Sequence, residues 1–351
     1  MYLNRYYLLD IARGLAAFVV VIFHYNIFYN IETSKTVFKT ENQPFYHFFY
    51  YCYEFGWIAV QFFFIISGFI FYALYSKQIS ERKISKFEFF KLRFSRLYPL
   101  HFITLIITVI LLYFSNKVSF NQPINGDVKH FFLNIFLIHK WGFESTHSFN
   151  QPSWSISIEA LLYLVFFIVF YFGKNNYSIT IILLILSVPL FFLNKFIGYG
   201  FFCFYMGGLT YLIYQKIIES KNRIKFMYFL SLILVFLSII IFNYLNSSVI
   251  IKIVTFTLFF PSIIINLMMI QTKFTGIGKS FKIIGDISYS VYLTHWVIQA
   301  LISLLIFNYK TKIDFNSNYV FLVYLMTVCL ISLISFKFFE RPIQKYIRSN
   351  F

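Results

Sequence analysis

An acid, a base and an imidazole lie within the first apolar stretch of the sequence. Residues 8–25 read LLDIARGLAAFVVVIFHY, a run suited to lipid that nevertheless contains Asp10, Arg13 and His24. Ionisable side chains are costly at membrane depth, so their presence there marks candidate functional positions. Histidine exchanges protons near physiological pH, which makes His24 a candidate general base.

The spacing of these residues predicts that Arg13 and His24 share a helix face. Eleven residues at 3.6 per turn bring them within roughly 20° of each other, about 16 Å apart along the axis. Asp10 precedes Arg13 by three residues and can pair with it. Two interpretations stay open: a channel lined by all three, or interfacial snorkelling by Asp10 and Arg13 with His24 in a packing hydrogen bond.

A second polar segment reads QPSWSISIEALLYLVFF over residues 151–167. Pro152 and Ser153 suit a helix start, and Ser153 or Ser155 can cap it. Glu159 then lies about one turn into the helix, at a depth similar to that of His24. A carboxylate beside an imidazole fixes its tautomer and raises its basicity, so we expect Glu159 within hydrogen-bonding reach of His24, directly or through one water. The alternative is a Glu159 that caps or snorkels near the interface.

A third segment, KLRFSRLYPLHF at 91–102, carries Arg93 and Arg96 at a spacing of three, so that both project from one side of a helix. The planar guanidinium fork matches phosphate oxygens, which makes the pair a candidate phosphate site. The alternative is the ordinary excess of Lys and Arg on the cytoplasmic side of membrane proteins.

A fourth segment, GDISYSVYLTHWVIQ at 285–299, places Ser288, Tyr292 and His295 on one helical stripe. Such a stripe either lines a cavity or packs one helix against another, and the spacing does not separate the two.

The elements that position these residues are predicted to be membrane helices. Only 12% of the residues are charged and 59% are hydrophobic, whereas soluble domains carry about 25% charged residues. We predict an all-α polytopic membrane protein in which about ten transmembrane helices form one bundle and a single domain over residues 1–351, with no appended soluble domain. The expected spans are 8–28, 57–76, 97–115, 156–172, 178–194, 199–215, 226–243, 249–270, 285–307 and 319–338.

The net charge of +17 is a topology signal rather than a sign of nucleic-acid binding. Most Lys and Arg residues fall in the segments that are cytoplasmic if the N-terminus is inside, which predicts that both termini are cytoplasmic. The long outer connections, about 29–56 and 116–155, are expected to fold over the outer face, with a short re-entrant helix at 131–139. The three cysteines lack metal-like or CxxC spacing, so no metal site is expected.

Six segments of the sequence resemble, in the same order, motifs of the acyltransferase 3 family of bacterial membrane acyltransferases. They are LDIARGLAAFVVVIFHY, AVQFFFIISGFI, RFSRLYPL, WSISIEALLY, ISYSVYLTHW and FERPIQKYI. The residues that match the family patterns include Arg13, His24, Ser67, Arg93, Arg96, Tyr98, Trp154, Ser155 and Glu159. The second segment departs from the pattern, because Gln61 stands where the family often has an acidic residue.

The resemblance implies a reaction in which an acyl group, acetyl foremost, moves from cytoplasmic acyl-CoA to a hydroxyl of a cell-envelope glycan in a bacterial inner membrane. It implies no permanently bound cofactor, with acetyl-CoA as the donor substrate. His24, Glu159 and Arg13 would be catalytic. Arg13, Arg93, Arg96 and Tyr98 would bind the donor. Asp10, Ser67, Trp154, Ser155, Tyr292 and His295 would line the substrate channel.

Two rival functions stay open. A transporter or flippase for a lipid-linked glycan also places charges inside the membrane, although the sequence shows neither inverted repeats nor paired broken helices. An N-acyl or succinyl transferase of the same family is the other alternative.

Overall fold

A computed structural model describes residues 5–30, 39–114, 124–144, 146–173, 176–220, 224–244 and 248–350. Within these residues, ten helices are long and apolar enough to cross a membrane, and each overlaps one predicted span. Their bounds are Tyr7–Tyr29, Tyr46–Ser80, Lys86–Phe114, Gln151–Phe172, Asn176–Leu193, Lys195–Glu219, Ile224–Phe242, Val249–Lys273, Lys279–Tyr309 and Asn318–Asn350. The prediction of an all-helical polytopic membrane protein is confirmed.

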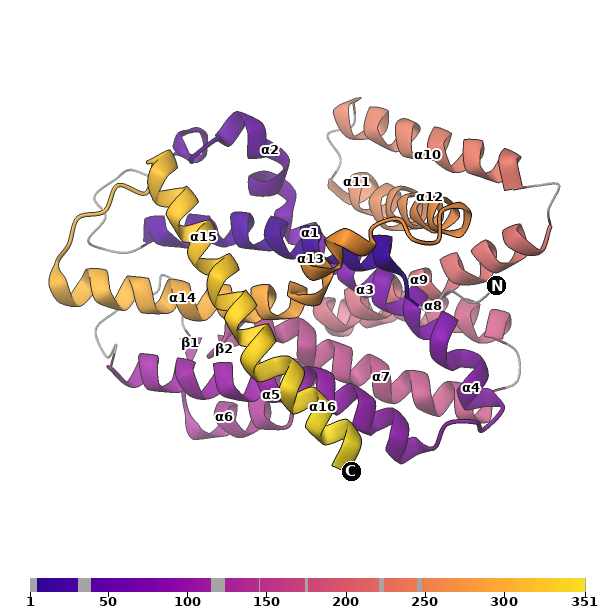
Figure 1. Ribbon diagram of the computed structural model, residues 1–351, viewed down its shortest axis with the longest axis horizontal. Helices are drawn as coiled ribbons and strands as arrows, with labels where there is room; N and C mark the ends of the chain where they lie inside the picture. The colour runs from indigo at the N-terminus through magenta and orange to yellow at the C-terminus, as the bar shows by residue number, and fades with distance from the viewer. Residues whose placement is uncertain are drawn as a thin grey trace. The chain divides into compact units, whose positions relative to one another are not determined.

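Figure 1 labels the α-helices of the described residues, numbered along the chain. They are α1 (Tyr7–His24), α2 (Tyr46–Phe55), α3 (Ala59–Phe71), α4 (Lys77–Ser80), α5 (Lys86–Phe114), α6 (Val128–Ile135), α7 (Trp154–Phe172), α8 (Asn176–Leu193), α9 (Lys195–Glu219), α10 (Ile224–Tyr244), α11 (Ser248–Val254), α12 (Phe260–Lys273), α13 (Lys282–Asp286), α14 (Ser288–Tyr309), α15 (Asn318–Ser335) and α16 (Arg341–Asn350). The described strands are the two-residue pair β1 (Ile124–Asn125) and β2 (His147–Ser148), which run parallel.

The helices group into two compact units. Unit 1 comprises Met1–Arg13, Val60–Ser85 and Leu162–Gly285, and unit 2 comprises Gly14–Ala59, Lys86–Leu161 and Asp286–Phe351. Each unit is therefore assembled from three separate stretches of the chain.

Close helix packing in unit 1 depends on glycines. A Cβ added at Gly68 of α3 would lie 1.8 Å from the carbonyl oxygen of Phe204 on α9, and one added at Gly207 would lie 1.9 Å from that of Ile65. No side chain fits at these distances, so α3 and α9 touch backbone to backbone. Small residues allow this close approach between membrane helices.

The pair α8 and α9 forms a helical hairpin within unit 1. Asn194 joins the two helices and caps α9, because its side-chain oxygen accepts hydrogen bonds from the backbone N–H groups of Phe196 and Ile197 at 2.9 and 3.3 Å. An Asn side chain at this position satisfies N–H groups that have no partner inside the helix.

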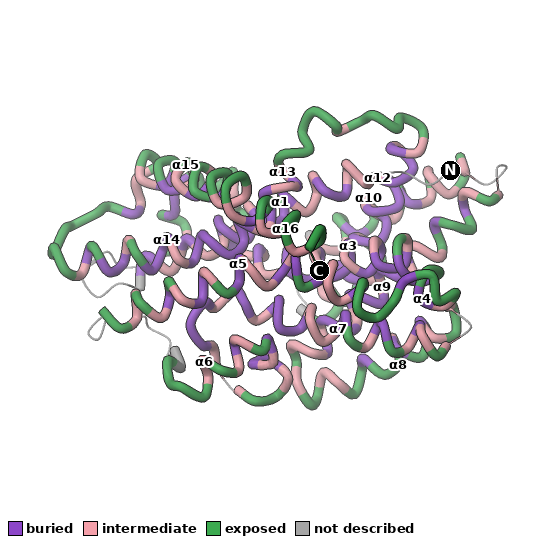
Figure 2. The backbone as a smooth tube through the Cα atoms, turned by 60° about the horizontal axis from the view of Figure 1, so that its bottom comes forward, coloured by how far each residue is buried: buried purple, intermediate pink, exposed green. Residues whose placement is uncertain are grey.

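Helix α14 is the central element of unit 2 and packs against α5 and α15 (Figure 1). Among the ten candidate membrane spans, the one that contains α14 has the largest fraction of buried residues. Figure 2 shows buried residues along much of this helix. Polar side chains on α14 are therefore enclosed by protein rather than exposed to lipid.

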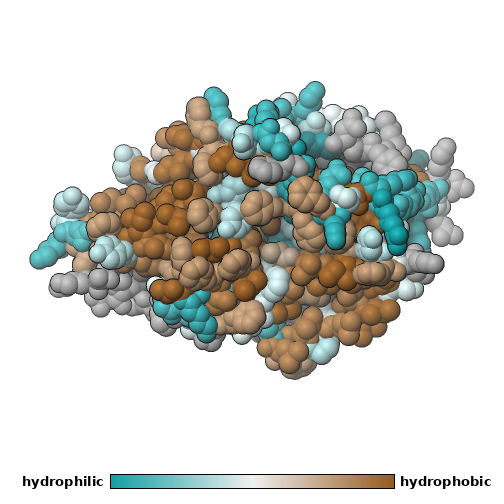
Figure 3. All heavy atoms as spheres, turned by 90° about the horizontal axis from the view of Figure 1, so that it is seen from below, coloured by the Kyte–Doolittle hydropathy of each residue, from teal (hydrophilic) through white to brown (hydrophobic). Residues whose placement is uncertain are grey.

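Helices α8 and α10 instead expose broad apolar surfaces. The exposed side chains of α8 include Ile185 and Phe192, and those of α10 include Phe229 and Phe236. Figure 3 shows wide areas of apolar side chains on the face that it displays. Apolar surfaces of this extent suit hydrocarbon rather than water.

The helix expected at 131–139 is observed as α6, but it begins at Val128 and ends at Ile135. Asp127 sets its start, because the carboxylate accepts a hydrogen bond from the His130 N–H at 2.9 Å. The same bond holds the pKa of Asp127 below its usual value. The helix ends early because Leu137 adopts a left-handed backbone with φ 57°.

Candidate functional site

His24 and His295 are joined by a hydrogen bond between their imidazole rings. Nδ1 of His24, the last residue of α1, lies 3.0 Å from Nε2 of His295 on α14. The ring planes are 13° from parallel and the centroids are 5.2 Å apart, so the rings meet edge to edge rather than face to face. His295 is fully buried and His24 is half-buried. His295 is therefore the more deeply enclosed residue of the pair.

Helix α14 also holds the backbone of His24. Gln299, one turn beyond His295, donates a hydrogen bond from Nε2 to the His24 carbonyl at 2.9 Å. The Trp296 ring contacts the His24 ring in a T-shaped arrangement, with centroids 6.0 Å apart and planes at 76°. Three neighbouring residues of one helix thus position the end of α1.

His295, rather than Glu159, is the hydrogen-bond partner of His24 among the described residues. Glu159 lies half-buried on α7, one turn beyond Ser155. Equal depth in a bilayer fixes the position of a residue along the helix axis but not the direction of its side chain. The ring that hydrogen-bonds His24 belongs to His295 of α14. The catalytic roles of His24 and Glu159 stay predictions.

Tyr292 connects α14 to the start of α7. Its hydroxyl donates to the carbonyl of Pro152 at 2.9 Å and lies 2.7 Å from the Ser155 hydroxyl. Asn150 donates to the carbonyl of Leu293 at 3.2 Å in the same region. The polar stripe of α14 therefore makes hydrogen bonds between elements of unit 2, and Trp154 stands half-buried at the first position of α7.

In unit 1, Asp10 and Arg13 form the ion pair that their spacing predicts. Nη2 of Arg13 lies 3.1 Å from Asp10 Oδ1 and also donates to the carbonyl of Gly285 at 3.1 Å. Arg5, which the sequence argument missed, contacts the other carboxylate oxygen of Asp10 at 2.6 Å. Gly285 permits this arrangement, because a Cβ there would lie 2.5 Å from the Asp10 backbone oxygen. Ser67 of α3 is also in unit 1 and is half-buried.

Three of the predicted donor residues, Arg93, Arg96 and Tyr98, lie in the first half of α5, in unit 2. Arg93 is buried and Arg96 is half-buried. The Tyr98 ring lies nearly parallel to that of Phe94, with centroids 4.5 Å apart. The helix continues through Pro99, and Tyr289 of α14 donates to the nearby Leu97 carbonyl at 2.5 Å.

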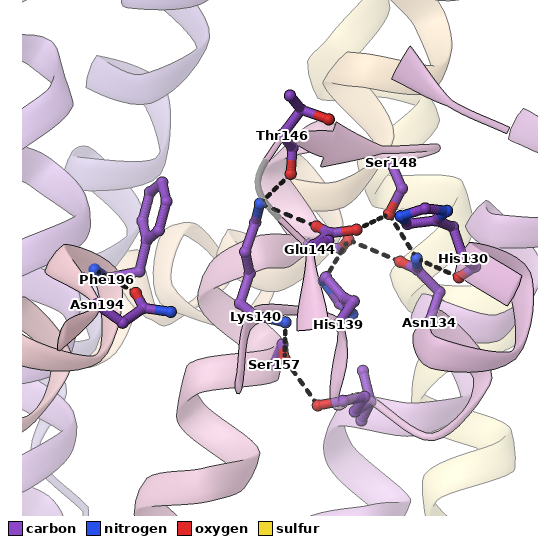
Figure 4. Close-up of polar contacts among 12 residues, drawn as sticks. His130, Asn134, His139, Lys140, Glu144, Thr146, Ser148, Ser157, Asn194 and Phe196 are labelled. Atoms are coloured by element: carbon purple, nitrogen blue, oxygen red, sulfur yellow. Dashed lines mark hydrogen bonds and ion pairs between the residues drawn. The ribbon is translucent and has the colours of Figure 1, made fainter. Parts of the chain in front are cut away.

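A buried ion pair that the sequence argument did not identify precedes α7 (Figure 4). Lys140 Nζ lies 2.9 Å from Glu144 Oε1, and the exposed fractions of the two side chains are 1% and 0%. Lys140 also donates to the carbonyl of Thr146, and Glu144 accepts from the Ser148 hydroxyl at 2.7 Å. The only signal in the sequence is a pair of opposite charges four residues apart, which is common on protein surfaces.

This ion pair lies in a strained stretch of chain. Leu137 and Phe149 adopt left-handed backbones with φ 57° and 48°, which is unfavourable for residues other than glycine. Ser157 of α7 holds the stretch by donating to the Leu137 carbonyl at 2.8 Å and accepting from the Lys140 N–H at 3.1 Å. Burial lowers the pKa of His139 well below its usual range, so this ring is neutral at neutral pH.

No group of three or more His, Cys, Asp or Glu side chains is arranged to hold a metal ion within the described residues. Buried ionisable groups that lie together include the histidine pair, the Asp10 cluster and the Lys140–Glu144 pair.

The fold and these buried ionisable groups define a multi-pass helical membrane protein with polar sites inside its helix packing. The sequence model described as an acyltransferase domain matches residues 6–337. The chain belongs to the acyltransferase 3 family.

Curated relatives carry related names. The chain is 26% identical over 337 residues to the O-acetyltransferase OatA of Staphylococcus aureus, covering 83% of this chain and 53% of that protein. It is 34% identical over 116 residues to the acyltransferase MdmB of Streptomyces mycarofaciens, covering 32% of this chain and 27% of the other. The chain thus spans about half the length of OatA and a smaller share of MdmB. No solved structure matches it.

Proposed function

We propose that this protein transfers an acyl group, acetyl foremost, from cytoplasmic acyl-CoA to a hydroxyl of a cell-envelope glycan. The observation that carries the proposal is the half-buried His24 at the end of α1, held by the fully buried His295. The membership of the acyltransferase 3 family and the name O-acetyltransferase of one relative support the reaction class.

In the proposed reaction, His24 removes the proton of the acceptor hydroxyl. The oxygen then attacks the thioester carbonyl carbon, a new C–O ester bond forms and the C–S bond breaks. The CoA thiolate leaves and takes the proton from the imidazolium, which returns His24 to its neutral form. A general base of this kind contributes about 10²–10⁴-fold to the rate.

The donor is proposed to bind at Arg93, Arg96 and Tyr98, with Arg13 nearer the thioester. Guanidinium groups bind the phosphates of CoA through paired hydrogen bonds. The acceptor side is proposed to include Trp154, Ser155 and Glu159, with His24 between donor and acceptor. The proposed location is a bacterial inner membrane, with both termini cytoplasmic.

The test is incubation of the purified protein, in proteoliposomes, with acetyl-CoA labelled in the acetyl group and with envelope glycan fractions. Mass spectrometry of the glycans should detect the labelled ester, and free CoA should appear in equal amount. The His24→Ala variant is the control for non-enzymatic transfer. Release of CoA without a labelled glycan, or labelled glycan from the variant at the same rate, would overturn the proposal.

A further inference from the structure

The hydrogen bond between the two histidines has a direction that a neighbouring backbone carbonyl determines. Nδ1 of His295 lies 3.0 Å from the carbonyl oxygen of Val291. A carbonyl oxygen only accepts, so Nδ1 of His295 carries a hydrogen. In a neutral imidazole the other nitrogen then holds a lone pair, and Nε2 of His295 is an acceptor.

The protonation of His295 determines which nitrogen of His24 carries the hydrogen. Because Nε2 of His295 accepts, Nδ1 of His24 must donate across the 3.0 Å that separates them. A neutral His24 with its hydrogen on Nδ1 keeps a lone pair on Nε2. A free histidine in water favours the opposite tautomer, with the hydrogen on Nε2, so the protein environment selects the less common form.

We propose that His295 is a positioning residue that holds His24 in the Nδ1–H tautomer and thereby makes Nε2 of His24 the proton acceptor. This inference rests on the proposed acyl transfer. His295 does not touch the substrates in this arrangement; it acts through His24.

The surroundings of His295 favour the neutral pair. The ring is fully buried, and within the described residues it contacts the Val291 carbonyl, the His24 ring and the Tyr292 ring. Protonation of His295 at this buried position would be opposed by the large free energy of desolvating a charge. A protonated His295 would also donate a hydrogen bond from Nε2 to Nδ1 of His24. A neutral His24 would then carry its hydrogen on Nε2, and neither of its nitrogens could accept a proton from the substrate.

The geometry also suits the charged state that follows proton transfer. Once Nε2 of His24 has gained a proton, its Nδ1–H still donates to His295, so the hydrogen bond persists and strengthens with the charge. Gln299 keeps the end of α1 in place through the His24 carbonyl. No rearrangement of the pair is needed during a turnover.

The first test is NMR of protein labelled with ¹³C and ¹⁵N at histidine, in nanodiscs at a pH where His24 is neutral. Carbon and nitrogen shifts of a neutral imidazole distinguish the two tautomers, and the His24 signals are those lost in His24→Ala. We expect the Nδ1–H form in the native protein. His295→Leu should move His24 to the Nε2–H form, and His295→Gln should retain Nδ1–H, because the Gln oxygen can accept the same hydrogen bond.

The second test is steady-state kinetics of the same variants. His295→Leu should lower kcat by roughly 10²-fold or more, with a small change in KM for acyl-CoA, and His295→Gln should recover part of the loss. Ser303→Ala is the matched control on α14, since among the described residues this buried hydroxyl hydrogen-bonds the Gln299 carbonyl of its own helix and no other group.

An Nε2–H tautomer in the native protein would overturn the inference, as would an unchanged tautomer in His295→Leu. If His295→Leu fails to fold, the native spectrum and the Gln variant still decide. The NMR result does not depend on turnover: an Nδ1–H His24 in a protein that transfers no acyl group would contradict the proposed function while leaving the tautomer assignment standing.

Discussion

At the scale of single residues, the chemistry of His24 depends on the atoms that occupy its ring nitrogens. His295 occupies Nδ1, and no described residue hydrogen-bonds Nε2. Glu159 of α7 does not take part in this hydrogen bond. The same imidazole in an apolar pocket without His295 would be free to adopt either tautomer.

The first prediction separates His24 from Glu159. His24→Ala should abolish measurable transfer, because the base contributes about 10²–10⁴-fold. Glu159→Gln should cost less, since it keeps the size of the side chain and leaves the His24–His295 pair intact. The measurement is kcat for both variants, with His47→Ala as the control because His47 is an exposed imidazole of unit 2. Near-normal turnover of the His24→Ala protein would contradict the mechanism.

The second prediction concerns the arginines of α5. Arg93→Ala and Arg96→Ala should raise the KM for acyl-CoA more than the KM for the acceptor. Replacement by Lys should recover only part of the affinity, because Lys lacks the planar fork. Arg93 is buried, so thermal unfolding of each variant must accompany the kinetics.

Comparison with dephospho-CoA donors identifies the phosphate that is bound. A variant that has lost a contact to the 3′-phosphate should no longer distinguish the two donors. If both donors lose activity equally in every variant, these arginines do not bind the 3′-phosphate.

At the scale of elements, the Lys140–Glu144 pair fixes the strained chain before α7. The two charges are buried together, and removal of either one would leave the other buried without a partner, which would destabilise the fold. The residues that follow, Trp154 and Ser155, are predicted to face the acceptor, and the ion pair therefore supports the position of that segment.

The third prediction follows from this burial. Glu144→Gln should destabilise the protein by about 3–5 kcal/mol, because it leaves the Lys140 charge buried without its carboxylate. Lys140→Met combined with Glu144→Leu should be less damaging than the single change. The measurement is chemical unfolding in detergent, and the control is Glu81→Gln at the exposed pair Lys77–Glu81. Equal stability of the Glu144→Gln and Glu81→Gln proteins would contradict the structural role of the pair.

At the scale of the whole molecule, the distribution of Lys and Arg predicts which connections face the cytoplasm. Seven Lys and Arg residues lie between the predicted spans 57–76 and 97–115, whereas the long connection 116–155 carries three. The proposed reaction requires this sidedness, because the proposal places the acyl-CoA donor on the cytoplasmic side and the acceptor on the other side.

The fourth prediction tests this topology with single cysteines in a protein whose Cys52, Cys203 and Cys329 have been replaced. Lys83→Cys should react with a membrane-impermeant thiol reagent only from the cytoplasmic side. Lys129→Cys should react only from the opposite side, and both positions are exposed. Labelling of the two positions from the same side would overturn the topology.

The sequence by itself determined the class of protein, the approximate position of each membrane helix and one local contact. Hydropathy over about 20 residues is a property of consecutive residues, so each predicted span overlaps an observed helix. The Asp10–Arg13 pair could be predicted for the same reason, because three residues of helix bring the two side chains together. The length of α5 was underestimated, since charged residues before position 97 lower hydropathy but do not end a helix.

Only the tertiary structure decided which side chains meet across helices. His24 and His295 are far apart in the chain, and their hydrogen bond depends on the rotation of α1 and α14 about their axes. The sequence gives the depth of a residue in the membrane, and depth alone favoured Glu159. The burial of Lys140 and Glu144 was hidden for a related reason: two opposite charges in a connection look the same whether the chain around them is solvated or folded over them. Helix rotation and loop folding are settled by the packing of many residues at once, which no local pattern records.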